Sequence, residues 1–304
     1  MEGSGWLWIA LSVWAAFAQT LRNTAQRSLT ASLGTLGATL VRFLYGLPFA
    51  LAWLAAVHYW RAEPLPAASW TFLGWVTLGA VAQIAATAFL LLAMEARSFA
   101  LGVAYSKTEI LQIAVFGLVF LGDPVSPATA LAVACGTLGV LLLSPADKER
   151  PFAALLAGLA TRPALLGLAS GAGFAFAAVG YRGAALSLDA SFLMSAATAL
   201  AVAQCIQTVL LGGWLLWRSP GVVAATLRLW RPSVFAGFMG AAASAGWFSA
   251  FALQSAAHVR TVGLIELVFS YAVSLKLFRE KLSPLELAGM AFLALGIAVI
   301  TLAG

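Results

Sequence analysis

Two stretches of this sequence decide its fold: residues 105–123, YSKTEILQIAVFGLVFLGD, and residues 262–280, VGLIELVFSYAVSLKLFRE. Each is an apolar segment of about the length of a membrane-spanning helix, and each carries one glutamate, Glu109 in the first and Glu266 in the second. The two glutamates lie 157 positions apart. A carboxylate at the centre of a bilayer costs roughly 2.5–3.5 kcal/mol, so both glutamates are candidates for a functional role.

The spacing of the two stretches belongs to a longer internal repeat. Each stretch runs into an acidic residue and then a Ser-Pro pair, and the prolines of these pairs, Pro127 and Pro284, are also 157 positions apart. Earlier in the chain, SLTAS at 28–32 recurs as SLDAS at 187–191, at an offset of 159. A length difference of two residues between the halves explains both offsets.

The composition indicates an all-α integral membrane protein. Of 304 residues, 62% are hydrophobic and 9% are charged, with a mean hydropathy of +0.96, whereas soluble domains carry about 25% charged residues. Apolar runs long enough to cross a bilayer as helices recur at short intervals and leave no room for a soluble domain. We predict ten such helices, at about 6–26, 33–58, 70–94, 99–121, 127–144, 164–186, 190–216, 233–257, 261–279 and 284–302.

The repeat divides these helices into five plus five. Because five is odd, the second copy enters the membrane from the opposite side, which makes an inverted repeat with a binding site expected near mid-membrane between the halves. The predicted organisation is a first repeat at 1–147, an interfacial linker at 148–163 and a second repeat at 164–304. Fused halves remove the need for a dimer, so a monomer is expected.

The basic residues predict the sidedness of the chain. Twelve Lys and Arg fall in the connections after odd-numbered helices and three in the others, and the positive side of a membrane protein faces the cytoplasm. Both termini are therefore predicted to lie outside the cytoplasm. Two of the basic connections, at 151–163 and 220–232, open with proline and close with Arg-Pro, which favours short helices in the interface over plain linkers.

Four ionisable residues fall well inside the predicted helices: Arg42, Lys107, Glu109 and Glu266. One interpretation is structural, because buried membrane charges generally pair with one another. The other is that one or more of them face a cavity and bind substrate or a coupling proton. We expect Glu109 and Glu266 to bind substrate, and Arg42 and Lys107 to be their charge partners, with both interpretations left open.

Helical spacing places Tyr105, Glu109, Gln112 and Phe116 on one face. This row of a hydroxyl, a carboxylate, an amide and a ring would be costly against lipid, so we expect it to face protein or water. Tyr105 and Gln112 therefore join the candidate substrate-binding residues.

The predicted helices at 164–186 and 233–257 are rich in Gly, Ala and Ser. The simpler interpretation is close helix packing, which small residues permit. The alternative is a cavity, with aromatic walls at Phe174, Phe176, Trp247 and Phe251. Further polar or aromatic candidates of the same kind are Gln83 and Trp14.

Sequence motifs of enzymes are absent. The chain has no HExxH, GxSxG, P-loop or GxGxxG motif, and its two cysteines and two histidines do not form a metal-binding pattern. We expect no catalytic residues, no metal, no cofactor and no nucleic-acid partner. With no ATP-binding domain, transport driven directly by ATP would need another subunit.

The whole chain resembles the drug/metabolite transporter superfamily, EamA type, and is closest in style to its bacterial aromatic amino-acid exporters. The specific part of the resemblance is the end of each half, LGDPVSPATALAVACGTLGVLLL at 121–143 and REKLSPLELAGMAFLALGIAVITLAG at 279–304. In that family a proline often follows a glutamate in the fourth helix of each half. Here Glu109 and Glu266 match the glutamate, while Ile110 and Leu267 stand in place of the proline.

The resemblance implies secondary transport, with export of small amino acids or related metabolites across the bacterial inner membrane by alternating access. A cationic-drug/proton antiporter is the first alternative, since a carboxylate in the cavity would serve it. A non-transporting membrane assembly protein is the second. Few intramembrane cations argue against a phosphate or nucleotide-sugar substrate, which needs an Arg/Lys clamp.

Overall fold

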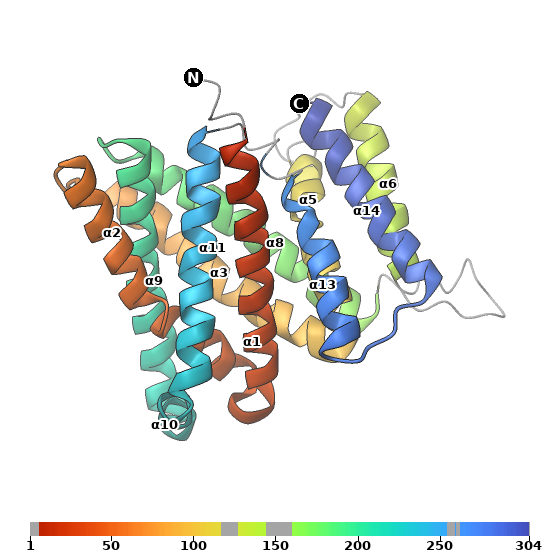
Figure 1. Ribbon diagram of the computed structural model, residues 1–304, viewed down its shortest axis with the longest axis horizontal. Helices are drawn as coiled ribbons and strands as arrows, with labels where there is room; N and C mark the ends of the chain where they lie inside the picture. The colour runs from red at the N-terminus through yellow and green to blue at the C-terminus, as the bar shows by residue number, and fades with distance from the viewer. Residues whose placement is uncertain (1–5, 117–126, 144–159, 254–258, 260–261, 304) are drawn as a thin grey trace. The chain divides into compact units, whose positions relative to one another are not determined.

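All regular secondary structure of the described residues is α-helix (Figure 1). The computed structural model describes residues 6–116, 127–143, 160–253, 259 and 262–303. The helices are α1 (Leu7–Leu44), α2 (Leu47–Arg61), α3 (Trp70–Ala96), α4 (Phe99–Ser106), α5 (Glu109–Phe116), α6 (Pro127–Leu143), α8 (Arg162–Leu186), α9 (Phe192–Arg218), α10 (Pro220–Arg228), α11 (Trp230–Leu253), α13 (Ile265–Lys276) and α14 (Pro284–Ala303).

Several helices are long and apolar enough to cross a membrane, which agrees with the predicted class. Among the described residues they are Leu7–Arg61, Trp70–Ala96, Arg162–Leu186 and Phe192–Arg218. The all-helical prediction is confirmed. The number of ten spans and their inverted arrangement remain predictions.

The chain forms two compact units, and each unit combines segments from both predicted sequence repeats. Unit 1 holds residues 1–88 and 176–266, and unit 2 holds residues 89–175 and 267–304. The boundaries between the units fall inside α3, α8 and α13. The repeats along the sequence and the compact units in space are therefore different divisions of the chain.

In unit 1, α1 reverses direction at Gly34. This residue has φ +67° and ψ 172°, a conformation that glycine adopts far more readily than other residues. The side chain of Gln26 donates to the backbone oxygen of Ala38 at 2.9 Å, although twelve residues of straight helix would separate them by about 18 Å. The connection predicted at 27–32 is wrong, because no Gly or Pro occurs between residues 6 and 33 to end the helix earlier.

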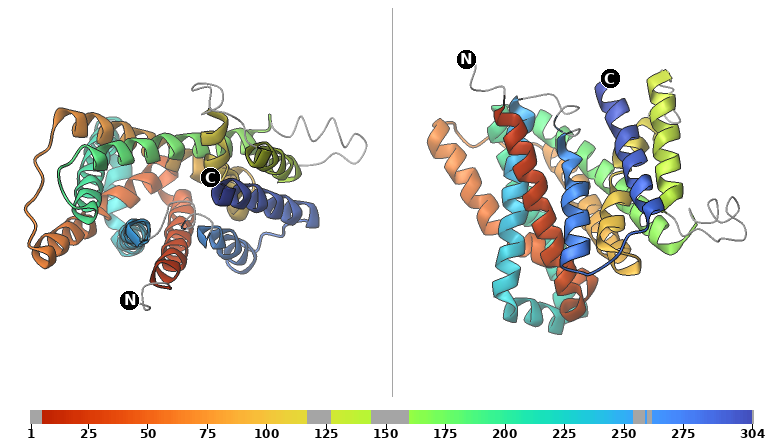
Figure 2. Two further views of the ribbon diagram at one scale, coloured as in Figure 1. Left: turned by 90° about the horizontal axis from the view of Figure 1, so that it is seen from above. Right: turned by 45° about the vertical axis from the view of Figure 1, so that its right-hand side comes forward.

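The first segment of α1 packs along α11 over most of its length, as both views show (Figures 1 and 2). Small residues permit the close approach. A Cβ added to Gly246 of α11 would lie 3.0 Å from the Cβ of Ala15 in α1.

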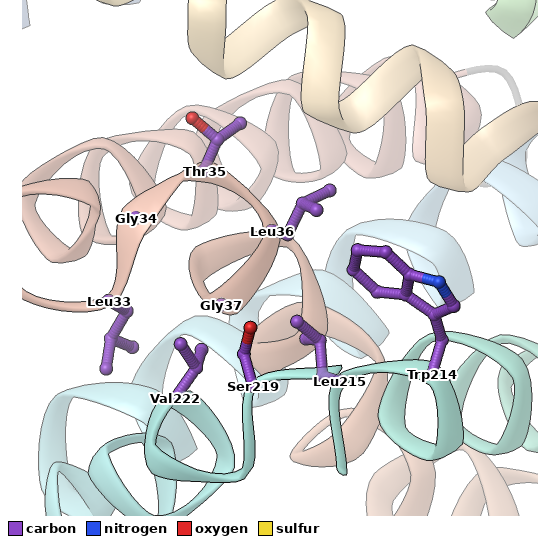
Figure 3. Close-up of a pocket in the computed structure, with 9 residues that line it drawn as sticks. All are labelled: Leu33, Gly34, Thr35, Leu36, Gly37, Trp214, Leu215, Ser219 and Val222. Carbon is purple, nitrogen blue, oxygen red and sulfur yellow. The ribbon is translucent and has the colours of Figure 1, made fainter. Parts of the chain in front are cut away.

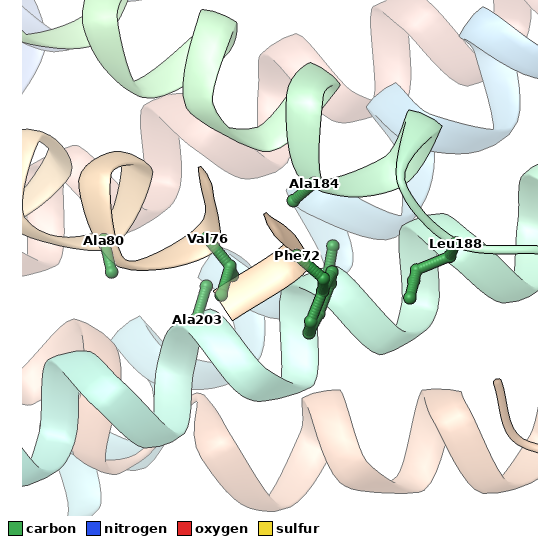
Figure 4. Packing of buried hydrophobic residues seen from close by; sticks show 7 residues of the cluster. Phe72, Val76, Ala80, Ala184, Leu188 and Ala203 are labelled. Carbon is green, nitrogen blue, oxygen red and sulfur yellow. The ribbon is translucent and has the colours of Figure 1, made fainter. Parts of the chain in front are cut away.

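A second contact in unit 1 joins α3, α8 and α9. It buries the side chains shown in Figure 4, which are mostly alanine: Phe72, Val76, Ala80, Ala184, Leu188, Ala199 and Ala203. A Cβ added to Gly180 of α8 would lie 2.6 Å from the backbone nitrogen of Gly79 in α3. The glycines of α8 therefore serve close helix packing, as the simpler interpretation of its composition predicted.

In unit 2, α6 and α14 form a similarly close pair (Figure 1). Cβ atoms added to Gly139 and to Gly289 would each lie 2.8 Å from the backbone oxygen of the other residue. The Ser-Pro pair before α14 begins that helix with a capping box. The oxygen of Ser283 accepts from the Glu286 nitrogen at 3.2 Å, and Glu286 accepts from the Ser283 nitrogen at 2.7 Å.

Two of the other predicted segments differ in detail. The helix expected over 99–121 is interrupted after Ser106 and begins again at Glu109. The short helix expected at 220–232 is confirmed as α10, which ends earlier, at Arg228. Its counterpart at 151–163 and the predicted linker lie mostly outside the described residues.

Candidate functional site

Glu266 lies at the start of α13 in unit 1, where its side chain is 1% exposed. Two amides of α1 donate to its carboxylate, Gln19 at 2.7 Å and Asn23 at 3.4 Å. A negative charge in the first turn is also favoured by the helix dipole. Glu266 is thus a buried carboxylate held by amide hydrogen bonds.

The polar face of α1 carries four residues that sequence reasoning did not select. They follow the spacing i, i+3, i+4, i+7: Gln19, Arg22, Asn23 and Gln26. Arg22 is 3% exposed and donates to the side-chain oxygen of Asn23 through Nε at 3.2 Å and Nη2 at 2.8 Å. The count of twelve basic residues in the connections includes Arg22, which is wrong because Arg22 lies inside α1. Its helical spacing from Gln19 and Gln26 is the signal that identifies it.

Trp247 of α11 contacts the same group of residues. Its indole nitrogen donates to the Gln19 side-chain oxygen at 3.2 Å. A Cβ added to Gly263, just before α13, would lie 2.7 Å from Cη2 of Trp247. The structure therefore brings two sequence-predicted residues, Trp247 and Glu266, to the same glutamine.

Arg42, in the second segment of α1, is 7% exposed and has a different set of contacts. Its Nη1 donates to the hydroxyl of Thr87 in α3 at 3.0 Å, and its guanidinium lies 5.5 Å from the ring centroid of Phe43. Among the described residues no carboxylate lies within ion-pair distance of Arg42. In the described part of the chain, Arg42 is thus not paired with the predicted glutamate.

The two arginines lie side by side against α11. A Cβ added to Gly240 would lie 3.2 Å from Cδ of Arg22 and 3.8 Å from Cγ of Arg42. Arg22 also interacts electrostatically with both Arg42 and Glu266. We call Gln19, Arg22, Asn23, Arg42, Thr87, Trp247 and Glu266 the charged cluster.

A neutral network continues from the charged cluster through α3, α8 and α9. The hydroxyl of Tyr181 donates to the side-chain oxygen of Gln83 at 2.8 Å, and Gln207 donates to the same oxygen at 2.8 Å. Tyr181 interacts electrostatically with Arg42, and Gln83 precedes Thr87 by one helical turn on α3. The structure therefore places the sequence candidate Gln83 in a partly buried polar network.

In the described part of unit 1, the buried charged side chains are Arg22, Arg42 and Glu266. Two guanidiniums and one carboxylate leave an excess of one positive charge. Burying a charge without a counter-charge is costly. The charged cluster can therefore receive an anionic group, and its carboxylate and amides can hold a donor.

Unit 2 contains the sequence candidates of the other half. Tyr105 is buried, and a Cβ added to Gly167 of α8 would lie 2.2 Å from its Cβ. One turn further along α8, a Cβ on Gly171 would lie 2.9 Å from the amide nitrogen of Gln112, which donates to the Leu168 backbone oxygen at 3.0 Å. Both Tyr105 and Gln112 therefore lie against α8, which agrees with the expectation that they face protein or water.

Glu109 begins α5 just as Glu266 lies in the first turn of α13. The turn before α5 begins at residue 107 and the turn before α13 is at residue 264, so the two turns begin 157 positions apart. Neither has a proline. At the first, the Thr108 hydroxyl donates to the Tyr105 backbone oxygen at 2.6 Å, a type of bond that bends helices.

The remaining candidates differ in their exposure, and the side chains of two of them are not described. Glu109 and Lys107 are half-buried, as is Phe174, whereas Phe176 is about half exposed and Trp14 is exposed. The side chains of Phe116 and Phe251 lie outside the described residues. Among the described residues no group of His, Cys, Asp and Glu could hold a metal ion.

An open groove of about 270 Å³ lies elsewhere in unit 1, between the Gly34 turn of α1 and the connection from α9 to α10 (Figure 3). Its lining is mainly apolar: Leu33, Gly34, Thr35, Leu36, Gly37, Trp214, Leu215, Ser219 and Val222. It includes none of the residues of the charged cluster.

Comparison with known proteins supports the fold alone. No protein-family model matches the sequence, and no curated protein matches it. A solved crystal structure, described only as that of a protein, is similar over 97% of this chain and 96% of its own, with a TM-score of 0.52 and 15% sequence identity. The helical arrangement therefore has a counterpart of nearly equal extent among solved structures.

Proposed function

We propose that this protein is a secondary transporter of the EamA type, with ten membrane spans arranged as an inverted repeat of five plus five. Its substrates are small amino acids or related metabolites, which it exports across the bacterial inner membrane by alternating access. The termini face away from the cytoplasm, and the chain acts as a monomer.

The observation that carries the proposal is the charged cluster in the interior of unit 1. Ionisable residues at membrane depth are costly and mark substrate or ion pathways. Glu266 adjoins an interrupted helix, and transporters commonly form their binding sites at such interruptions. A cluster with both guanidinium and carboxylate groups suits a small solute that carries charge of both signs.

The residues of the charged cluster also bear on the two alternative functions. Glu266 is the kind of carboxylate that a cationic-drug/proton antiporter uses, but the two buried arginines of the cluster would repel a cationic drug. A non-transporting protein would use the same residues to hold helices together. That role predicts no solute exchange.

Counterflow in proteoliposomes tests the proposal. Vesicles are loaded with single unlabelled amino acids, and uptake of labelled phenylalanine and threonine is followed in wild type, Glu266→Gln and Glu109→Gln. Asp189→Asn, which removes an exposed carboxylate from the α8–α9 connection, is the matched control.

We expect exchange in the wild type and in Asp189→Asn, and loss of exchange in Glu266→Gln at equal amounts of folded protein. No exchange with any amino acid would contradict the amino-acid substrate. Electrogenic proton exchange driven by organic cations would favour the antiporter instead.

A further inference from the structure

Arg42 has more hydrogen-bonding capacity than its protein contacts use. A guanidinium carries five N–H donors, and among the described residues Arg42 makes one hydrogen bond, to Thr87. Its planar donor pairs match the two oxygens of a carboxylate. The remaining N–H donors of this buried arginine can therefore bind an acceptor that the described part of the protein does not supply.

Thr87 adds a second group at the same place. Its hydroxyl oxygen accepts from Arg42, and the side chain is almost fully buried. A hydroxyl that accepts one hydrogen bond can still donate its own proton. An anion next to the guanidinium could thus be bound by both residues.

The charge of the cluster sets the charge of the anion. Glu266 balances one of the two buried arginines, so one positive charge is left over. A single carboxylate cancels this excess positive charge, whereas a doubly charged phosphate would leave the cluster with a net negative charge. A solute with an amine and no carboxylate would increase the excess positive charge.

From these contacts we infer that Arg42, assisted by Thr87, binds the carboxylate of a monocarboxylate substrate, and that the substrate's amine is dispensable. The inference rests on the proposed function for the site's role in transport, but not for binding itself. It extends the substrate class from amino acids to small organic acids that lack an amine.

Equilibrium binding to the purified full-length protein in detergent tests this inference without transport. The probes are 3-phenylpropionate, phenylalanine and phenethylamine, which share a ring and differ in their charged groups. Propionate serves as a smaller acid, and inorganic phosphate, at a pH above its second pKa, serves as a dianion. We expect the carboxylates to bind and phenethylamine and phosphate not to bind. Binding should weaken by at least about tenfold in Arg42→Gln and less in Arg42→Lys.

Arg218→Gln, which removes an exposed arginine at the end of α9, is the control and should bind as wild type does. If Arg42→Gln does not fold, the relative affinities of the wild-type protein for the carboxylate, amine and phosphate probes test the inference. Phenethylamine binding as tightly as 3-phenylpropionate, tighter binding of phosphate, or no binding of any carboxylate would overturn the inference. Carboxylate binding without counterflow would uphold the inference and reject the transporter, whereas counterflow of amines alone would overturn the inference and favour the antiporter.

Discussion

Replacing Glu266 by glutamine changes the charge of the buried cluster while keeping the size of the side chain. The glutamine oxygen can still accept from Gln19, so the geometry of the 2.7 Å hydrogen bond is preserved. The negative charge near Arg22 is lost, and two arginines remain buried with no carboxylate in the cluster. The glutamine nitrogen replaces the oxygen that accepts from Asn23 at 3.4 Å, so this weak hydrogen bond is lost together with the charge.

The expected loss of stability follows from two terms. Hydrogen bonds to charged groups contribute about 1.5–3 kcal/mol and neutral ones about 0.5–1.5 kcal/mol, so the bond from Gln19 loses about 1 kcal/mol. The loss of the negative charge near buried Arg22 adds a further cost, which is limited because Arg22 keeps its two hydrogen bonds to Asn23. We expect Glu266→Gln to lower the free energy of unfolding by about 2–4 kcal/mol.

Unfolding in mixed micelles, followed by circular dichroism, measures this loss. Arg22→Gln should also destabilise the protein, but the double variant should lose less than the sum of the two, with a coupling of about 0.5–3 kcal/mol. Additive losses would refute the electrostatic coupling of Arg22 to Glu266. Unchanged stability in Glu266→Gln would refute the view that its charge balances the cluster.

Three further predictions concern the scaffold. In Gly139→Ala the new Cβ would lie 2.7 Å from the backbone nitrogen of Leu293, so α6 and α14 must separate, and we expect a loss of about 1–3 kcal/mol in the same unfolding assay. Gly34→Ala should cost about 1–3 kcal/mol because alanine disfavours φ +67°, whereas a wild-type unfolding curve would show that the α1 reversal is not required. The side chain and backbone of Ser191 donate to Glu63 and lower its carboxyl pKa. The stabilisation of the folded protein by these hydrogen bonds is therefore present above the ordinary glutamate pKa of about 4.3 and is lost as the pH falls below it. Wild type should therefore lose more stability than Glu63→Gln on acidification, and equal losses would contradict the assignment.

Much of the local structure could be predicted from the sequence because it depends on neighbours along the chain. The hydrophobic runs indicated the helices, and the Ser-Pro pair at 283–284 marked the start of α14 through a cap that spans four residues. The turns before Glu109 and Glu266 could not be located in advance, because Ile110 and Leu267 stand where the family has proline and hydroxyl back-bonding at Thr108 is too weak a signal.

The sequence by itself determined that the protein is helical, that its helices are apolar enough for a membrane, and that Glu109 and Glu266 occupy corresponding places. The tertiary structure alone decided the neighbours of Glu266, because Gln19 is 247 positions away from it in the chain. Likewise, Arg42 and Glu266 have opposite charges and could have paired, but the reversal of α1 at Gly34 brings Arg42 to Thr87. A charge can be recognised from one residue, whereas its partner depends on how helices distant in sequence pack.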